Sequence, residues 1–232
     1  MNTVVTIRFA QSTLYAVRGP SGTALIDAGP PGKAAAVERA LRRAGIDDVT
    51  LIAITHCHPD HIGGAAALSR SLKAPVAVGR AESDWAAAGH SHFYEPQRPF
   101  GRILDKTMGR RYPPVGPDLL LDDGDALDEF GVALDAFAVP GHTPGSTAYL
   151  DRDSGAVFVG DLLAGGMLPA AAPGPPFLAQ ERERIAPSVH KALQTGASRW
   201  YFGHGRPASA LEVLRAWGPV PVVRADPAVP RG

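Results

Sequence analysis

The sequence Thr55-His56-Cys57-His58-Pro59-Asp60-His61 decides how this chain is interpreted. It follows the apolar run Leu51-Ile52-Ala53-Ile54 and offers three histidines and one aspartate as ligands. Successive side chains of an extended backbone point to opposite sides, so His56, His58 and Asp60 are expected on one side. Imidazole and carboxylate groups are common ligands of zinc and iron. The spacing therefore predicts a metal site rather than a polar turn with unrelated histidines.

The residues after this motif predict a helix that begins near Ile62 and ends near Leu72. Asp60 would lie close to its N-terminus, and His61 would be rotated towards a neighbouring space. One segment could then serve two adjacent ions. Gly63 and Gly64 lower the helix propensity and allow backbone or substrate to approach closely, which favours a site at this position.

Three further candidate ligands each follow an apolar, strand-like segment. They are His142 after residues 132–139, Asp161 after residues 156–160 and His204 after residues 199–202. A single histidine at a strand end is more often a hydrogen-bonded loop residue, so each signal alone is weak. A carboxylate directly after a buried strand is costly unless it is paired or bound to a metal. Taken together, the three residues support the metal site.

The ordered motifs resemble those of the metallo-β-lactamase-fold hydrolase superfamily. The resemblance spans roughly residues 22 to 206 and is carried by Leu25-Ile26-Asp27-Ala28-Gly29, His56-Cys57-His58-Pro59-Asp60-His61, Pro140-Gly141-His142-Thr143-Pro144-Gly145-Ser146, Val159-Gly160-Asp161 and Gly203-His204-Gly205. It implies an α/β fold, a four-layer αββα sandwich of two mixed β-sheets with flanking helices.

The resemblance also implies a ligand set for two Zn²⁺ ions, with iron or manganese as open alternatives. One ion would be held by His56, His58 and His142, the other by Asp60, His61 and His204, and Asp161 would bridge both. Asp27 matches an acidic position behind the site, where it would orient a ligand histidine. A turn-forming aspartate before Gly29 is the competing interpretation of Asp27.

The implied activity is that of a dinuclear zinc-dependent hydrolase. A metal-bridging hydroxide would cleave an activated acyl bond of a thioester, lactone or ester, and Asp60 would orient the nucleophile and carry a proton. The alternatives that stay open are a mononuclear iron sulfur dioxygenase of the same fold, a β-lactam hydrolase and a non-catalytic binding protein. Because the sequence shows no recognisable export signal, β-lactam hydrolysis is not the expected native role. Leu162-Leu163-Ala164 stand where lactonases of this fold place a tyrosine after the bridging aspartate, which weakens the lactonase interpretation without excluding it.

The segment after Asp161 predicts the substrate class. Residues 162–178 contain glycine, proline and apolar side chains but no charged residue. Such a segment beside a metal centre suits an uncharged small molecule better than a phosphate chain, which calls for Arg or Lys. Met167 and Phe177 are therefore predicted to wall the substrate pocket, unless the segment is only a packed surface connection.

Composition limits the partners and the location. Lys plus Arg and Asp plus Glu number 23 each, so no net charge attracts nucleic acid or an anionic membrane. A chain without a long apolar run or a signal segment is expected in the cytoplasm, and a homodimer stays open. A single domain is predicted over residues 1–217, followed by a proline-rich tail over residues 218–232. The only cysteine, Cys57, is expected to be structural because alternation turns it away from His56 and His58.

The remaining signals are weaker. His90 and His92 repeat the two-residue spacing without an acidic partner, so a place on a loop over the site is favoured over metal binding, and their role stays open. His190 is expected at the surface or its boundary, and Thr143 and Ser146 are expected to cap a turn. Helices are predicted over residues 33–44, 80–88, 179–193 and 208–217, the third of them kinked or restarted at Pro187.

Overall fold

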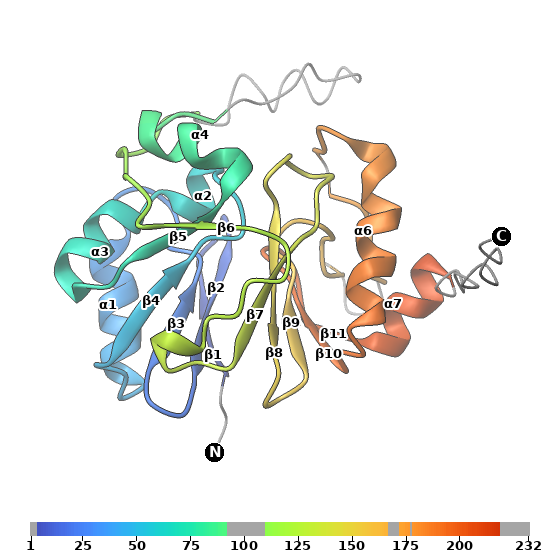
Figure 1. Cartoon of the computed structure of the whole chain (residues 1–232), viewed down its shortest axis with the longest axis horizontal. Coiled ribbons are helices and arrows are strands. Elements are labelled where there is room, and N and C mark those ends of the chain that lie inside the picture. The colour runs from blue at the N-terminus through green and yellow to red at the C-terminus, as the bar shows by residue number, and fades with distance from the viewer. Residues whose placement is uncertain (1–3, 92–109, 167–171, 177, 219–232) are drawn as a thin grey trace, which may run out of the picture.

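Two mixed β-sheets face each other in the middle of the protein, and helices cover their outer sides (Figure 1). The computed structural model describes residues 4–91, 110–166, 172–176 and 178–218. The helices outside the first sheet are α1 (Ala34–Arg43), α3 (Ala65–Leu72) and α4 (Ser83–Ala88), and those outside the second are α6 (Arg182–Gln194) and α7 (Ala210–Trp217). The four-layer αββα arrangement expected from the sequence is confirmed. None of the helices in the described ranges is long and apolar enough to cross a membrane.

The first sheet has six strands in the order β1-β2-β3-β4-β5-β6. Its strands are β1 (Val4–Arg8), β2 (Thr13–Arg18), β3 (Thr23–Ile26), β4 (Val49–Ala53), β5 (Val76–Gly79) and β6 (Leu119–Leu121). The pairs β1/β2 and β2/β3 are antiparallel, whereas β3 to β6 run parallel. Parallel neighbours need crossover connections: α1 lies between β3 and β4, α3 between β4 and β5, and α4 between β5 and β6.

The second sheet has five strands in the order β11-β10-β9-β8-β7. Its strands are β7 (Leu134–Ala138), β8 (Thr147–Asp151), β9 (Ala156–Phe158), β10 (Arg199–Tyr201) and β11 (Ala208–Ser209). Only β9 and β10 are parallel, and α6 (Arg182–Gln194) connects them. Helix α7 (Ala210–Trp217) follows β11, and the 3-10 helix η2 (Asp128–Phe130) precedes β7.

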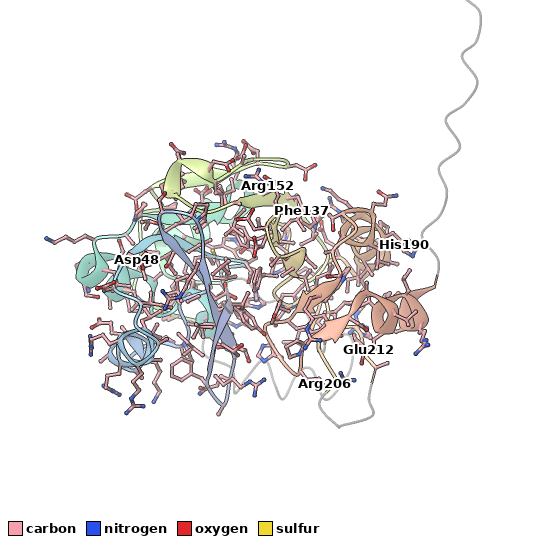
Figure 2. All side chains as sticks on the ribbon, turned by 90° about the horizontal axis from the view of Figure 1, so that it is seen from below. Asp48, Phe137, Arg152, His190, Arg206 and Glu212 are labelled. Atoms are coloured by element: carbon pink, nitrogen blue, oxygen red, sulfur yellow. The ribbon has the colours of Figure 1, made fainter. Side chains whose placement is uncertain are left out.

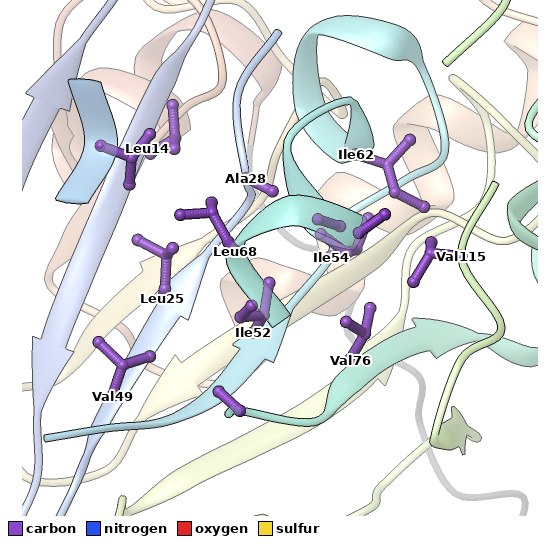
Figure 3. Close-up of a cluster of buried hydrophobic side chains, with 14 of the residues drawn as sticks. Leu14, Leu25, Ala28, Val49, Ile52, Ile54, Ile62, Leu68, Val76 and Val115 are labelled. Atoms are coloured by element: carbon purple, nitrogen blue, oxygen red, sulfur yellow. The ribbon is translucent and has the colours of Figure 1, made fainter. Parts of the chain in front are cut away.

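Both faces of the first sheet are buried, because one side packs on helices and the other on the second sheet. In β2, Leu14 and Ala16 join the cluster beneath the helices, whereas Tyr15 and Val17 join the cluster between the sheets. The period of two thus assigns alternate side chains to two cores. Figure 3 shows the helix-side cluster, in which Leu68 of α3 lies close to Ile52 and Leu25 of the sheet.

The helix predicted to follow the metal motif is divided into two. Helix α2 (Pro59–Ile62) is a single short turn, and α3 begins at Ala65 after the two glycines. A Cβ on Gly63 would lie 2.3 Å from Pro59 O, and a Cβ on Gly64 would lie 2.3 Å from Ala28 O. The glycines therefore allow the backbone to pack closely beside the motif. The predicted helix and its end at Leu72 are confirmed, but it begins at Ala65 rather than near Ile62.

Three other helix predictions need corrections at their N-termini. Residues 80–82 form the 3-10 helix η1 (Arg80–Glu82), and α4 (Ser83–Ala88) begins only after it. The helix predicted from residue 179 begins at Arg182, and that predicted from residue 208 begins at Ala210 because Ala208–Ser209 pair with β10 as β11. Ser209 then caps α7, where its side chain and that of Glu212 form a capping box.

Helix α6 continues through Pro187 without a restart. Proline removes one backbone donor from a helix, which normally costs about 3 kcal/mol. Packing holds the helix together on both sides of this position, because Ile185 and Val189 are buried against the second sheet. Ser188 Oγ also donates a hydrogen bond of 2.6 Å to Pro140 O, which ties the helix to the loop after β7.

Two tyrosines join the sheets next to the predicted metal motifs. Tyr15 of β2 donates its hydroxyl to Phe202 O at 2.8 Å, and Tyr149 of β8 donates to Ile54 O at 2.7 Å. Each acceptor carbonyl follows a strand of the opposite sheet and precedes a segment with a candidate ligand. Burial raises the pKa of both phenols, so each hydroxyl stays protonated and acts as a donor. These bonds fix the two sheets relative to each other at the site.

We expect Tyr15→Phe and Tyr149→Phe each to lower the free energy of unfolding by about 1–3 kcal/mol, because each leaves a buried carbonyl without its donor. Tyr201→Phe is the matched control, since Tyr201 stacks on Phe158 and no described hydrogen bond involves its hydroxyl. Urea unfolding of the three variants measures the difference. Equal midpoints for all three would contradict the role of the two bonds.

Candidate metal centre

The histidine motif occupies the turn from β4 into α2. His56 and His58 belong to the extended segment, and His58 is the N-cap of α2 with an extended backbone at φ −78° and ψ 148°. Pro59 takes the first helical position, which tolerates proline because no backbone donor is needed there. The extended backbone, and with it the alternation of side chains, therefore ends at His58. The prediction that Asp60 shares the side of His56 and His58 was wrong, since the helical turn directs Asp60 to a second group.

The first group consists of three buried histidines, His56, His58 and His142. His142 Nε2 lies 3.2 Å from His56 Nε2 and 2.9 Å from His58 Nδ1. Three nitrogens around one tetrahedral zinc ion, each 2.0–2.1 Å away, would be ~3.3 Å apart. The other ring nitrogens of two of these histidines are held from behind, because His142 Nδ1 contacts Leu178 O at 2.7 Å and His56 Nδ1 contacts Thr55 Oγ1 at 3.1 Å. The group fits one ion.

The second group consists of Asp60, His61 and His204. Asp60 Oδ2 lies 3.4 Å from His204 Nε2 and 3.6 Å from His61 Nε2. These residues come from α2 and from the loop after β10, so this group also joins the two sheets. The structure thus brings together the two sets that the resemblance implies.

Asp161 lies between the two groups. Its Oδ2 is 3.1 Å from His204 Nε2 and 3.7 Å from His142 Nε2, and its Oδ1 is 3.6 Å from His61 Nε2. One carboxylate therefore reaches histidines of both groups, as a bridging ligand must. Gly203 makes room for it, because a Cβ on Gly203 would lie 2.3 Å from Asp161 Oδ1.

Asp27 lies directly behind the site, at the end of β3. Its carboxylate accepts hydrogen bonds from Thr55 N at 2.8 Å and from Thr55 Oγ1 at 3.0 Å, and its Oδ2 lies 2.8 Å from His61 Nδ1. A proton on Nδ1 of His61 satisfies this contact and leaves Nε2 facing the second group. The placement matches the orienting role predicted for Asp27, and its positive φ of 63° shows that it also forms the turn.

The electrostatics of the two groups differ. Burial lowers the pKa of His56 and His58 well below the usual range of histidine, and lowers that of His142, so the first group consists of neutral imidazoles. Asp161 raises the pKa of His204 to about 11. Burial opposes a charge on His61, but nearby carboxylates raise its pKa to about 9.

Buried atoms without partners show where cations fit. Among the described residues, neither His61 Nε2 nor Asp161 Oδ1 has a hydrogen-bond partner, and the two lie 3.6 Å apart. Burial alone would raise the pKa of Asp161, but the neighbouring histidines His204 and His61 lower it well below its usual range. A divalent cation would satisfy both atoms and replace the protons that otherwise balance the carboxylates.

Other predicted residues have the structural roles expected for them. Cys57 is buried outside the groups found among the described residues, and its thiol donates to Glu82 O. Thr143 Oγ1 and Ser146 Oγ lie 2.7 Å apart, and Ser146 Oγ accepts a bond from Thr143 N at 3.2 Å, as in a capped turn. His190 is half-buried on α6, well away from β1 and α1, and its Nε2 lies 3.4 Å from Trp217 O (Figure 2).

Several predictions fall on segments that the structure does not describe. Met167 and Phe177, the predicted walls of the pocket, lie outside the described residues, as do His92 and residues 219–232 of the predicted tail. His90 is described and pairs with Arg111 in an isolated bridge. The substrate-pocket prediction therefore stays a prediction.

Sequence reasoning missed two residues that hold the motif in place. Ser12 Oγ donates a bond of 2.6 Å to Asp60 O, and Glu82 accepts bonds from the backbone of two ligand-bearing loops. Burial raises the pKa of Glu82, and the bonds from Thr143, Cys57 and Gly145 oppose that rise. The available signal for Glu82 was a carboxylate soon after a fully buried strand. Ser12 lies in a turn without any local pattern.

Comparisons with known proteins agree with this geometry. The sequence model of the family described as "Metallo-beta-lactamase superfamily" matches residues 7–205. Uncharacterized protein YobT of Bacillus subtilis (strain 168) is 28% identical over 202 residues, which cover 83% of this chain and 82% of that protein. A hydroxyacylglutathione hydrolase of Ectopseudomonas mendocina (strain ymp) is 30% identical over 190 residues, which cover 82% of this chain but only 60% of that enzyme.

A solved structure of a metallo-β-lactamase with an HARLDQ motif from Cronobacter sakazakii has the same fold. It superposes with a TM-score of 0.66 at 24% sequence identity, over 86% of this chain and 70% of that chain. The family match extends over all seven candidate ligands as well as Asp27. The chain therefore belongs to the metallo-β-lactamase superfamily of metal-dependent hydrolases.

Proposed function

We propose that the protein is a dinuclear zinc hydrolase that cleaves an activated acyl bond of a small, largely uncharged molecule. The observation that carries this proposal is the convergence of seven side chains in two groups that share Asp161. A mononuclear iron site of two histidines and one aspartate would leave the other group without an ion. The completeness of both groups therefore favours two ions over the sulfur dioxygenase alternative.

The proposed ligands follow the two groups. His56, His58 and His142 hold one ion, Asp60, His61 and His204 hold the other, and Asp161 contacts both. A set dominated by imidazole suits zinc, although iron and manganese accept similar ligands. When bound, the ions would polarise the scissile carbonyl and lower the pKa of a water molecule towards neutrality.

Asp60 is the proposed catalytic residue. Its side chain is 18% exposed, in contrast to the fully buried His61 beside it, so it can reach both solvent and reacting atoms. Burial would raise its pKa, but His61 and His204 lower it, so the carboxylate is ionised and can accept a proton. The bond from Ser12 to Asp60 O fixes the backbone from which this side chain extends.

The substrate class rests on the site chemistry and on the relatives. Hydroxyacylglutathione hydrolase, the name of a relative 30% identical, denotes cleavage of a thioester, which is an activated acyl bond. Lactones, esters and β-lactams share the same electrophilic carbonyl. Met167 and Phe177 belong to the proposal as walls of the pocket. The proposal also includes a small-molecule substrate and a cytoplasmic location. It includes no nucleic-acid or membrane partner, and it is compatible with a homodimer.

We expect the purified protein to bind two equivalents of zinc, because both ligand groups are complete. Asp161→Ala should lose at least one equivalent, since Asp161 contacts both groups, whereas Cys57→Ser should keep both. Elemental analysis of the wild type and the two variants measures this. Equal loss in both variants would contradict the ligand assignment, and one equivalent of iron with oxygen-dependent persulfide turnover would replace the hydrolase by the dioxygenase.

We expect neutral thioesters, esters or lactones to be hydrolysed with a higher kcat/KM than phosphodiesters, because residues 162–178 offer no cation for a phosphate. Met167→Ala/Phe177→Ala should raise KM for the preferred acyl substrate through loss of apolar contact. A substrate panel that includes a β-lactam measures both effects. Faster phosphodiester turnover, or unchanged kinetics of the double variant with every acyl substrate, would refute the proposed pocket.

A further inference from the structure

Glu82 is a buried carboxylate that touches both loops of the three-histidine group. Its side chain belongs to η1 and the residue is only 1% exposed. Oε2 accepts a hydrogen bond of 2.5 Å from Cys57 N, and Oε1 accepts one of 3.1 Å from Gly145 N. Cys57 lies between His56 and His58, and Gly145 follows His142 by three residues. One side chain thus links the backbone segments that carry all three histidines.

The packing around Glu82 leaves little room for the loops to move separately. A Cβ on Gly145 would lie 2.8 Å from Glu82 Cγ, and a Cβ on Gly79 would lie 2.2 Å from Gly145 O. The loop of His142 therefore rests directly on the turn that carries Glu82. On the other side, Ser91 Oγ donates a bond of 2.9 Å to Cys57 O, so Cys57 is held at both its N–H and its carbonyl.

The chemistry of these contacts demands a carboxylate of this length. The Cys57 and Gly145 N–H groups can only donate, and the Thr143 side chain supplies a further bond, so two acceptor oxygens are needed. A glutamine would present its NH₂ group to one of the two donors, and an aspartate is one methylene shorter. A buried carboxylate is costly unless it is hydrogen-bonded. Apolar side chains such as Cys57 and Ala86 already pack in the neighbouring core cluster, so Glu82 is not needed there for apolar packing.

We infer that Glu82 is a positioning residue that sets the distance between the His56–His58 segment and His142, and thereby the affinity for the ion that these three histidines hold. Glu82 acts through the two backbone amides and contacts no ligand side chain in the bonds described above. Asp27 has a corresponding place at the second group, where it contacts His61 directly. The inference rests on the proposed two-ion site.

Glu82→Gln tests this inference because it keeps the size of the side chain but must lose one of the two amide bonds. Glu129→Gln is the matched control, because it makes the same change of side chain at an exposed position. Zinc affinities are measured by chelator competition, and NMR of the histidine rings identifies which residues each ion binds. Amide exchange of Cys57 and Gly145 in the metal-free protein reports the two bonds without any activity assay.

We expect Glu82→Gln to weaken zinc binding at His142 by about 10–100-fold, the usual effect of losing a group that supports a ligand, and to leave binding at His204 unchanged. Exchange of the Cys57 or the Gly145 amide should become faster, and Glu129→Gln should behave as the wild type. Asp27→Asn should give the opposite preference, with the larger loss at His204.

Three results would overturn the inference. They are unchanged binding at His142 in Glu82→Gln, equal weakening at His142 and His204, and failure of the metal-free variant to fold, since the last two assign Glu82 to the fold as a whole. A wild-type protein that binds no ion at His204 would instead refute the two-ion proposal. The response of the His142 ion to Glu82→Gln would still decide the role of Glu82.

Discussion

The metal centre depends on a buried hydrogen-bonded carboxylate, Asp27, which is 2% exposed. A charge removed from water must be paired or hydrogen-bonded, and Asp27 achieves this only by binding the residues around the histidine motif. Its bonds to Thr55 fix the segment that enters the motif, and its contact with His61 fixes the segment that leaves it. Asp27, at the end of β3, thereby fixes the positions of the ligand residues that follow β4.

The strand ends bring the remaining ligands to the same place. Asp161 follows β9 and His204 follows β10, and these parallel neighbours end side by side. Tyr15 and Tyr149 then hold the two sheets together one or two residues away from the ligand loops. The loops that carry these ligands are thus anchored by hydrogen bonds and by the rigid strands that they follow, which keeps the ligand positions precise.

The sequence predicted the fold and the two ligand groups because the ligands sit in short motifs whose order is specific. Local rules failed where tertiary packing decided the outcome. Alternation assigned Asp60 to the wrong group because Pro59 begins a helix, and Pro187 did not restart α6 because buried neighbours hold that helix. The position of Glu82 after a buried strand was a signal, but its partners could not be predicted, since they lie 25 and 63 residues away and are backbone amides without a sequence signature.

Each ligand group takes residues from both sheets, so neither half of the chain can hold an ion alone. In the first group, His56 and His58 follow a strand of the first sheet and His142 follows a strand of the second. In the second group, Asp60 and His61 come from the half of the chain that forms the first sheet, and His204 follows a strand of the second. An ion that binds only the folded protein adds its binding free energy to the stability of the fold. With both ions bound, part of the free energy that holds the two sheets together would therefore come from the metal, and a chelator would lower the stability of the whole sandwich.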